Sequence, residues 1–548
     1  MKDIAQNVHP AAVAYAQETF DGTLSRREFL SRATALGVTA TTAYSLIGLS
    51  APAHAAGHMA QGGTLRIQQD VRPLKDPPTF DWPQLANVAR GWLEYLIEYS
   101  RDGVFSGRLL ESWEVNDDAT QYTLNIRPAV MWNDGTPFTS ADVAYNITRW
   151  SDTTIEGNSM ASRLSALINP ETGTLADGAM TVVDDMTIVL NLANPDITLV
   201  ATFSDYPSAV VQNGFSGDPA QNQVGTGPYK MVEYEVGVKA VLERNTDHTW
   251  WGEGAALDRI EFIDLGVEGS AHVAAAESDE IDMVYETVGE FVGLMDTIGW
   301  TKSEALSANS VVLRTNQVAE DADGMKPYAD ARVRRALAMA TDNAVLLELG
   351  YDGLGSVAEN HHVCPIHPEY AELPAPVYDP EGARALMEEA GMLDFEHELI
   401  SIDDTWRKNT TDALAAQLRD AGFKVKRTVL PGSTFWNDWA KYPFSSTDWG
   451  HRPLGVQNLT LAYKSGVAWN ETAFANEEFD TLLAEASAIA DAAKRSEVMA
   501  RIQTIMQEEG VVIQPYWRSV YRHHKENVVG AETHPIFEIH LYKLGLAA

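Results

Sequence analysis

A glycine-rich turn followed by two alternating runs of apolar residues lies near the middle of the chain. Gly225, Gly227 and Pro228 interrupt regular structure, because glycine frees the backbone and proline fixes φ. Apolar and aromatic side chains then alternate with polar ones on both sides of Gly237, within residues 229–243. This alternation predicts a turn that leads into a β-hairpin.

Similar patterns predict further strands and helices over most of the chain. Period-two alternation predicts strands at 64–68, 122–126, 259–263 and 311–317. Apolar residues at helical spacing behind a capping side chain predict helices that begin at Thr139 or Ser140, span 330–349 and lie within 378–391. The pattern therefore indicates a chain built from both strands and helices.

Length and composition describe an ordinary globular protein with an acidic surface. The 548 residues correspond to about three or four folding units, and 45% hydrophobic residues with 9% aromatics exclude a disordered chain. A net charge of −37 argues against binding to nucleic acid or to an anionic membrane, because both require clustered lysine and arginine. Cys364 is the single cysteine, which excludes an intrachain disulfide.

The first 55 residues have the features of an export signal. The segment SRREFL at 25–30 is a twin-arginine signature, an uncharged stretch follows at 33–49, and Ala-His-Ala at 53–55 is a small-residue cleavage site. This combination predicts export of the folded protein to a bacterial periplasm by the twin-arginine (Tat) machinery. The leader contains no cysteine, so a free, soluble mature protein is predicted rather than a lipid-anchored one.

Several phrases of the sequence, in this order along the chain, together resemble one family. They are LLESW at 109–113, FTSADV at 138–143, GTGPY at 225–229 and RVRRAL at 332–337. The chain resembles the extracytoplasmic solute-binding proteins of peptide-type ABC importers, known as family 5. It departs from the family at 279–282, where DEID lacks the glycine of a G-x-x-D step.

The resemblance implies an α/β, two-lobed periplasmic binding protein-like fold of class II type, with an additional subdomain inserted in the first lobe. It also implies capture of a peptide or related small zwitterionic solute by a monomer that delivers it to ABC permease subunits in the inner membrane. The implied organisation is a signal peptide at 1–55, first-lobe segments at 56–108 and 225–310, an inserted subdomain at 109–224, a second lobe at 311–514 and a return to the first lobe at 515–548.

Residues 445–470 are where the resemblance implies that substrate choice is made. In the family's peptide binders an aspartate of a D-x-x-D-P loop meets the ammonium group of the ligand. This chain has Asp448 and Trp449 in that region, followed by Arg452 where the family tends to be acidic. Asp448 and Arg452 are predicted to hold a zwitterion from both ends, with Trp449 supplying apolar area. The alternative is that Asp448 and Arg452 pair only with each other.

Four more residues are candidate ligand contacts. Trp82 follows a loop that in the family reaches the cleft, and Trp406 follows a predicted strand, where ligands of open α/β sheets bind. Arg314 and Asn316 share one face of the predicted strand 311–317, which resembles the family's hinge strand. Two structural alternatives are open: Trp82 packs between elements, and Arg314 forms a surface ion pair.

Neither metal nor enzyme chemistry is predicted. His361, His362, Cys364 and His367 lie within seven residues, but their spacing matches no zinc pattern and the neighbouring prolines indicate a loop. The sequence contains no GxSxG, HExxH or phosphate-loop motif, so we predict a protein that is not an enzyme and holds no cofactor. Two other functions stay open: a periplasmic carrier of a metal chelate or tetrapyrrole, and an exported hydrolase.

Overall fold

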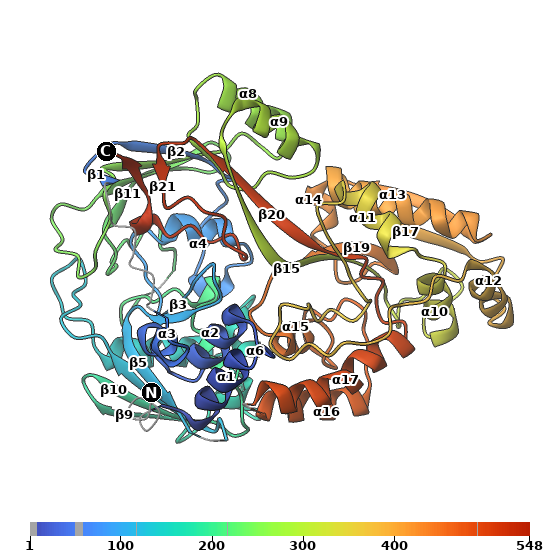
Figure 1. The fold of residues 1–548 in the computed structure, drawn as a ribbon, viewed down its shortest axis with the longest axis horizontal. Helices are drawn as coiled ribbons and strands as arrows, with labels where there is room; N and C mark the ends of the chain where they lie inside the picture. Colours follow the sequence, from blue (N-terminus) through green and yellow to red (C-terminus); the bar gives the residue numbers. More distant parts are fainter. Residues whose placement is uncertain (1–7, 50–58, 117, 216, 490) are drawn as a thin grey trace.

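Two lobes are joined by a pair of long antiparallel strands in the computed structural model, which describes residues 8–49, 59–116, 118–215, 217–489 and 491–548. Strand β15 (Thr301–Thr315) and strand β20 (Tyr516–His524) pair from Thr301↔His524 onward and cross from one lobe to the other (Figure 1). The predicted strand at 311–317 is therefore too short at its start. The residues before 311 are mixed polar and apolar, so no alternation marks them, and cross-strand pairing with β20 extends the strand.

One sheet of eleven strands runs through both lobes in the order β11-β12-β13-β2-β14-β20-β15-β19-β17-β18, with β16 added beside β20. Its strands are β2 (Thr64–Gln68), β11 (Tyr229–Glu235), β12 (Lys239–Arg244), β13 (Arg259–Ile263), β14 (Met283–Val284), β16 (Gly355–Val357), β17 (Glu396–Ile402), β18 (Lys424–Leu430) and β19 (Phe444–Trp449). The sheet confirms the hairpin predicted around Gly237, because β11 and β12 pair antiparallel from Tyr229↔Arg244 to Glu235↔Lys239.

The glycine-rich turn that precedes this hairpin fits only because it lacks side chains. A Cβ at Gly225 would lie 1.9 Å from the carbonyl oxygen of Trp92, and one at Gly227 would lie 2.7 Å from that of Gly91. The amide of Gly227 donates to the same Trp92 carbonyl at 2.9 Å. The two glycines therefore let the turn pack directly against the backbone that follows α4 (Pro83–Ala89).

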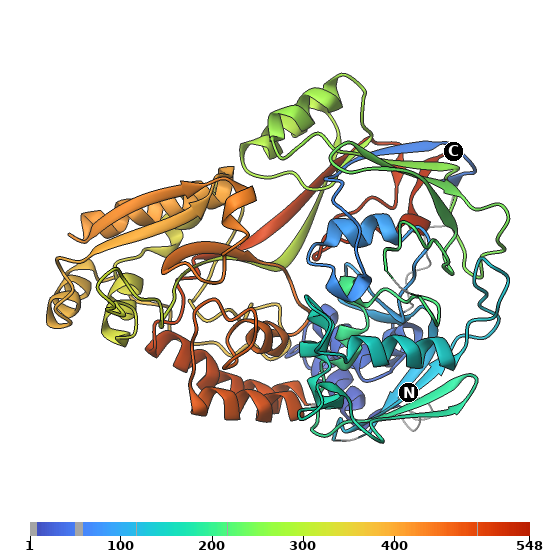
Figure 2. The ribbon, with the colours of Figure 1, turned by 180° about the vertical axis from the view of Figure 1, so that it is seen from behind.

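A separate four-stranded antiparallel sheet lies in the first lobe, with the order β5-β6-β10-β9. Its strands are β5 (Leu110–Val115), β6 (Gln121–Ile126), β9 (Met180–Asp184) and β10 (Thr187–Asn191). Helix α5 (Ser140–Trp150) packs on this sheet behind a capping box formed by Thr139 and Asp142 (Figure 2). Helical spacing predicts a buried side that carries Val143 and Ile147, and both are buried, together with Trp150.

Helices of the second lobe cover its part of the long sheet. The predicted helix at 330–349 is two helices, because Asp342 accepts hydrogen bonds from the amides of Ala344 and Val345 and starts a new helix after a break. The helices are α10 (Ala331–Met339), α11 (Asn343–Tyr351), α12 (Pro380–Glu389), α13 (Thr405–Asp420), α14 (Gly432–Phe435), α15 (Gly455–Ala462), α16 (Glu477–Ala488) and α17 (Ala492–Glu508).

Short elements complete the chain. In the first lobe these are β1 (Met59–Ala60), β3 (Ile97–Tyr99), β4 (Phe105–Gly107), α6 (Ser159–Arg163), β7 (Ile168–Asn169), β8 (Thr174–Leu175), α7 (Leu199–Thr202), α8 (Gly269–Glu277), α9 (Glu290–Ile298), β21 (Val528–Val529) and β22 (Gly545–Ala547). No helix among the described residues combines the length and apolar character that a membrane crossing requires.

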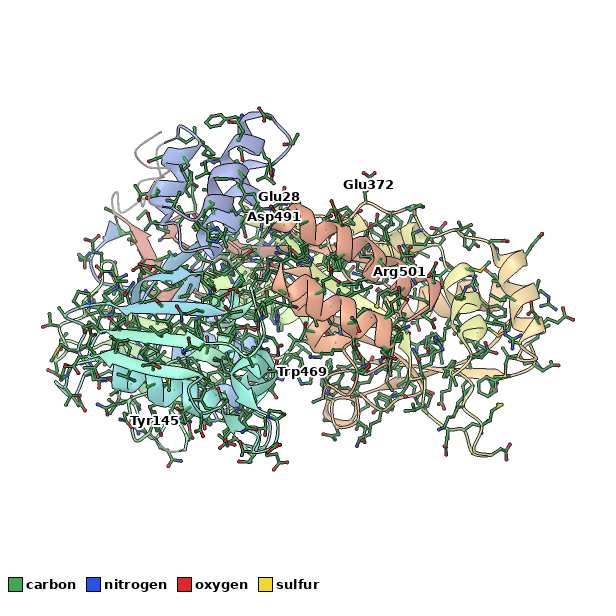
Figure 3. The ribbon with its side chains drawn as sticks, turned by 90° about the horizontal axis from the view of Figure 1, so that it is seen from below. Glu28, Tyr145, Glu372, Trp469, Asp491 and Arg501 are labelled. Atoms are coloured by element: carbon green, nitrogen blue, oxygen red, sulfur yellow. The ribbon has the colours of Figure 1, made fainter. Side chains whose placement is uncertain are left out.

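The predicted leader is helical where it is described, with α1 (Pro10–Phe20), α2 (Arg26–Ala35) and α3 (Ala40–Leu46). We expected this segment to stand outside the fold, but it packs against both lobes, beside α17 (Figure 3). Arg32 donates to the carbonyl oxygen of Pro368 at 2.6 Å, and Thr34 accepts from the amide of Phe105 at 3.0 Å. Apolar faces of the three helices bury against one another and against Val104. The predicted cleavage site at 53–55 lies outside the described residues.

Candidate functional site

A cavity of about 460 Å³ lies where the two lobes face each other beside the crossing strands. Its walls come from first-lobe residues in 75–84 and Tyr206, from the crossing region at Asn309 and Arg518, from second-lobe residues in 436–452, and from the C-terminal residues Ile536 and Phe537. This volume suits a small ligand, since ligand cavities usually measure about 300–1,000 Å³. Two other cavities among the described residues measure only about 30 Å³ each.

Aromatic side chains make up much of the wall. They are Phe80, Trp82, Tyr206, Tyr285, Trp436, Trp439, Trp449, Trp469 and Phe537. Trp82 of the first lobe meets Trp436 of the second edge to face, with ring centroids 5.3 Å apart. The two lobes therefore touch through these rings, and the cleft between them is closed in this structure.

Asp448 and Arg452 both line the cavity, but each pairs with another residue. Asp448 Oδ1 lies 3.0 Å from Arg407 Nε, and Arg452 Nε lies 3.5 Å from Asp205 Oδ2. The alternative in which Asp448 and Arg452 pair only with each other is therefore wrong. Arg407 comes from the first turn of α13, and Asp404 caps that helix and binds Arg407 Nη1 at 2.9 Å.

The ion pair of Asp448 and Arg407 stays partly exposed on the cavity wall, with side chains 21% and 17% exposed. Although Asp448 Oδ1 and Arg407 Nε are 3.0 Å apart, neither atom makes a hydrogen bond of acceptable geometry within the described residues. Burial opposes the charge of Arg407, but the carboxylates of Asp404 and Asp448 outweigh it and raise the pKa of Arg407. A ligand with both an ammonium and a carboxylate group can therefore meet a charged partner for each in one place.

A second charged pair of the wall joins the crossing strand to the first lobe. Arg518 of β20 forms an ion pair with Glu286, and its guanidinium lies 4.1 Å from the centre of the Trp406 ring. Burial disfavours the cation, but Tyr351 and Glu286 outweigh it and raise the pKa of Arg518. Trp406 itself lies behind Arg518 and is not part of the wall, so its predicted ligand contact is corrected.

The predictions for Arg314 and Asn316 are also corrected, since neither side chain reaches the cavity. Arg314 is fully buried, and its Nε donates to Glu471 Oε2 at 2.8 Å. Its other nitrogens donate to the carbonyl oxygens of Tyr442, at 2.8 Å, and of Trp439. Asn316 accepts from the amides of Val318 and Ala319 and stabilises the end of β15.

Glu471 is the residue behind the wall that joins these contacts. Its Oε1 accepts from the indole nitrogen of Trp449 at 2.8 Å, and both its oxygens contact the hydroxyl of Thr447, at 2.6 and 2.7 Å. Through Arg314 it also holds the chain segment that carries Trp439. One buried carboxylate therefore holds three residues that line the cavity: Thr447 and Trp449 directly, and Trp439 through Arg314.

The histidine- and cysteine-containing loop at 361–367 is buried behind the wall, and its rings have protein partners. His362 Nδ1 lies 2.8 Å from the Tyr463 hydroxyl, and His367 Nε2 lies 3.0 Å from the carbonyl oxygen of Arg452. The amide of Cys364 donates to His367 Nδ1 at 2.9 Å. Burial lowers the pKa of His362 to about 3 and that of His367 to about 4, so both rings are neutral at physiological pH.

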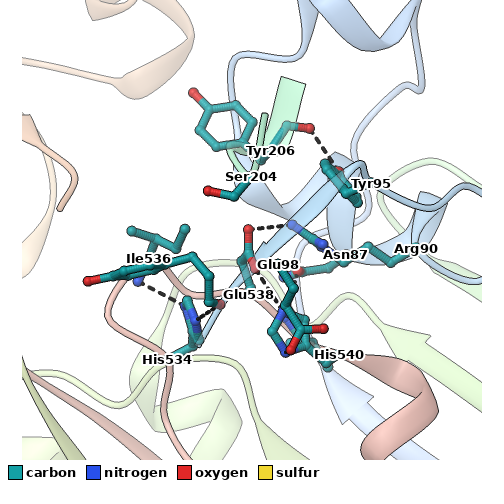
Figure 4. Close-up of polar contacts among 12 residues, drawn as sticks. Asn87, Arg90, Tyr95, Glu98, Ser204, Tyr206, His534, Ile536, Glu538 and His540 are labelled. Atoms are coloured by element: carbon teal, nitrogen blue, oxygen red, sulfur yellow. Dashed lines mark hydrogen bonds and ion pairs between the residues drawn. The ribbon is translucent and has the colours of Figure 1, made fainter. Parts of the chain in front are cut away.

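Another group, His534, Glu538 and His540, brings three possible ligand atoms within 4.8 Å of one another (Figure 4). Each group has a protein partner: His534 Nδ1 accepts from the amide of Ile536, His540 Nε2 lies 2.8 Å from Glu538 Oε2, and Glu538 pairs with Arg90. Burial raises the pKa of Glu538 to about 8. These contacts fix the C-terminal loop whose Ile536 and Phe537 line the cavity.

Comparison with known proteins decides the family. The model of the bacterial extracellular solute-binding proteins, family 5 Middle, matches residues 104–471. The chain belongs to this family of solute-binding proteins. The dipeptide-binding protein DppE of Bacillus subtilis is 22% identical over 510 residues, covering 87% of this chain and 91% of its own.

Solved structures of family 5 type share the fold. The binding protein AgaA of A. tumefaciens R10, in complex with agropinic acid, matches with a TM-score of 0.76 at 22% identity and covers 89% of this chain and 99% of its own. OppA of Haemophilus influenzae, in complex with the peptide RPPGFSPFR, matches with a TM-score of 0.77 at 21% identity and covers 89% and 100%. The predicted two-lobed α/β fold is confirmed.

Of the seven predicted ligand contacts, the structure places Trp82, Asp448, Trp449 and Arg452 on one cavity wall. Their contact with a ligand stays a prediction. Sequence reasoning missed the partners Arg407, Arg518 and Glu286. Arg407 follows the candidate Trp406 directly in the sequence, so the capped turn after strand β17 was the available signal for it.

Proposed function

We propose that this chain is the periplasmic substrate-binding component of an ABC importer, and that it captures a peptide or related small zwitterionic solute between its lobes. The observation that carries the proposal is the pair of Asp448 and Arg407, two opposite charges on the wall of an aromatic cavity, whose side chains stay 21% and 17% exposed. Closure of the lobes removes water from the ligand and creates a surface that the open form lacks. Permease subunits that bind this surface favour the loaded state.

Isothermal titration calorimetry of the purified chain with dipeptides and opine-like amino-acid derivatives tests this proposal. We expect at least one such zwitterion to bind with a Kd of about 1 μM or tighter, because closure buries both charged ends. The ligand recovered from the complex is expected to have an unchanged mass. Cleavage of the ligand would support an exported hydrolase instead, and a visible absorption band of the purified protein would support a carrier of a tetrapyrrole or metal chelate.

We also propose the remaining features of the precursor. Residues 1–55 direct export by the twin-arginine machinery, and a mature monomer that begins near residue 56 works in the periplasm. The crossing strands β15 and β20 support a second lobe at 311–514, and the separate four-stranded sheet supports an inserted subdomain at 109–224.

A further inference from the structure

Five of the fourteen tryptophans of the chain line one cavity. They are Trp82, Trp436, Trp439, Trp449 and Trp469, which we call the tryptophan wall. The first comes from the first lobe and the other four come from the second. All of them except Trp449 are only partly buried. Part of each of these four side chains therefore stays accessible to a ligand.

Two rings of the tryptophan wall, those of Trp449 and Trp469, are held in orientation by their neighbours. The indole N–H of Trp449 donates to Glu471 at 2.8 Å, so Trp449 offers a ligand its ring and no hydrogen bond. Trp469 packs against Trp449 with ring centroids 6.1 Å apart at an interplanar angle of 66°. The carbonyl oxygen of Trp439 accepts from Arg314, which Glu471 holds. Because these contacts lie within the second lobe, Trp449 and Trp469 lose little conformational entropy when a flat group settles on them.

Charge does not determine which of several zwitterions of similar size binds best. Every lysine, arginine, aspartate and glutamate on the cavity wall lies within 4.0 Å of an oppositely charged partner among the described residues: Lys75 with Asp81, Arg407 with Asp448, Arg518 with Glu286 and Arg452 with Asp205. Two zwitterions of similar size therefore meet the same set of paired charges on the wall. Once its two charged ends are met, the aromatic surface of the wall decides between zwitterions of similar size.

We infer that the ligand is a small zwitterion that carries an aromatic ring, and that this ring lies on the tryptophan wall. The inference rests on the proposed function. Aromatic rings attract one another in offset or edge-to-face arrangements beyond the gain from burial alone, and the Trp82–Trp436 contact shows that the cleft closes with rings at this spacing. A saturated ring of similar bulk gains the burial but not the interaction between aromatic rings.

The experiment measures Kd by calorimetry for Ala-Ala, Ala-Phe, Phe-Ala and the two matching peptides with cyclohexylalanine in place of Phe. We expect one Phe peptide to bind at least about tenfold more tightly than Ala-Ala and about threefold more tightly than its cyclohexyl counterpart. Equal affinity for Ala-Ala and both Phe peptides overturns this inference alone. No binding by any of the five peptides also contradicts this inference, and the proposed function is overturned as well if the opine-like derivatives fail to bind too.

Variants separate the wall from general effects on folding. Trp436→Leu and Trp439→Leu are expected to abolish the preference for the Phe peptide while leaving the affinity for Ala-Ala within about twofold. Trp300→Leu, outside the cavity and directly before β15, is the matched control and should keep the preference. Circular dichroism checks that each variant folds. A preference that survives in both wall variants contradicts the inference.

Discussion

Glu471→Ala is expected to lower the free energy of unfolding by about 3–5 kcal/mol, because it leaves the buried guanidinium of Arg314 without its carboxylate. The side chains of Arg314 and Glu471 are 0% and 1% exposed, so water cannot replace the lost partner. The indole N–H of Trp449 loses its acceptor at the same time. Urea unfolding followed by circular dichroism measures the change.

Two further variants distinguish an unpaired buried charge from a general loss of packing. Arg314→Met combined with Glu471→Leu removes both charges and is expected to recover most of the lost stability, since apolar pairs often replace buried ion pairs without cost. Glu478→Ala removes one of the two carboxylate partners of Arg501 at the surface, where the side chains of Glu478 and Arg501 are 51% and 43% exposed, and should change stability by less than about 1 kcal/mol. If Glu471→Ala unfolds at the same urea concentration as the original chain, the structural role assigned to Glu471 is wrong.

Asp448→Asn is expected to weaken the binding of a zwitterionic ligand by about 10- to 100-fold, because a hydrogen bond to a charged group contributes about 1.5–3 kcal/mol. The substitution keeps the shape of the side chain and removes the charge that meets the ammonium group. Arg407 keeps its second partner, Asp404, so the fold is expected to persist. Calorimetry with the tightest dipeptide found for the original chain measures the change.

Asp412→Asn provides the matched control for this effect. Asp412 lies in the same helix as Arg407 and pairs with Lys408 and Arg427, but it is not on the cavity wall. Its substitution should leave the Kd within about twofold of the original value. An unchanged Kd for Asp448→Asn would remove Asp448 from the ligand site and would leave the cavity without its proposed partner for an ammonium group.

Local sequence patterns predicted the elements whose formation depends on nearby residues. The hairpin around Gly237 and the capped helix after Thr139 follow from turn and capping residues that act within a few positions. The long strand β15 was only half predicted. Its C-terminal part pairs with β19, whereas the first part, which has no alternation, is extended by pairing with β20.

The candidate site shows why side-chain roles were harder to predict. Alternation placed Arg314 on a polar strand face, which suggested a cleft, but β15 is central in the sheet and the residue beneath that face is the buried Glu471. Asp448 and Arg452 are close in sequence, yet Arg407 and Asp205 come from other parts of the chain and pair with them. Ion pairs between distant segments depend on the tertiary structure, so the spacing of nearby residues in the sequence cannot predict them.

Small-angle X-ray scattering of the purified chain, with and without a dipeptide at a concentration that calorimetry shows to be saturating, tests the central claim most directly. Rotation of the lobes about β15 and β20 predicts a smaller radius of gyration in the loaded protein, with the dipeptide recovered intact. Superimposable scattering profiles at saturation, or a cleaved dipeptide, would contradict the account.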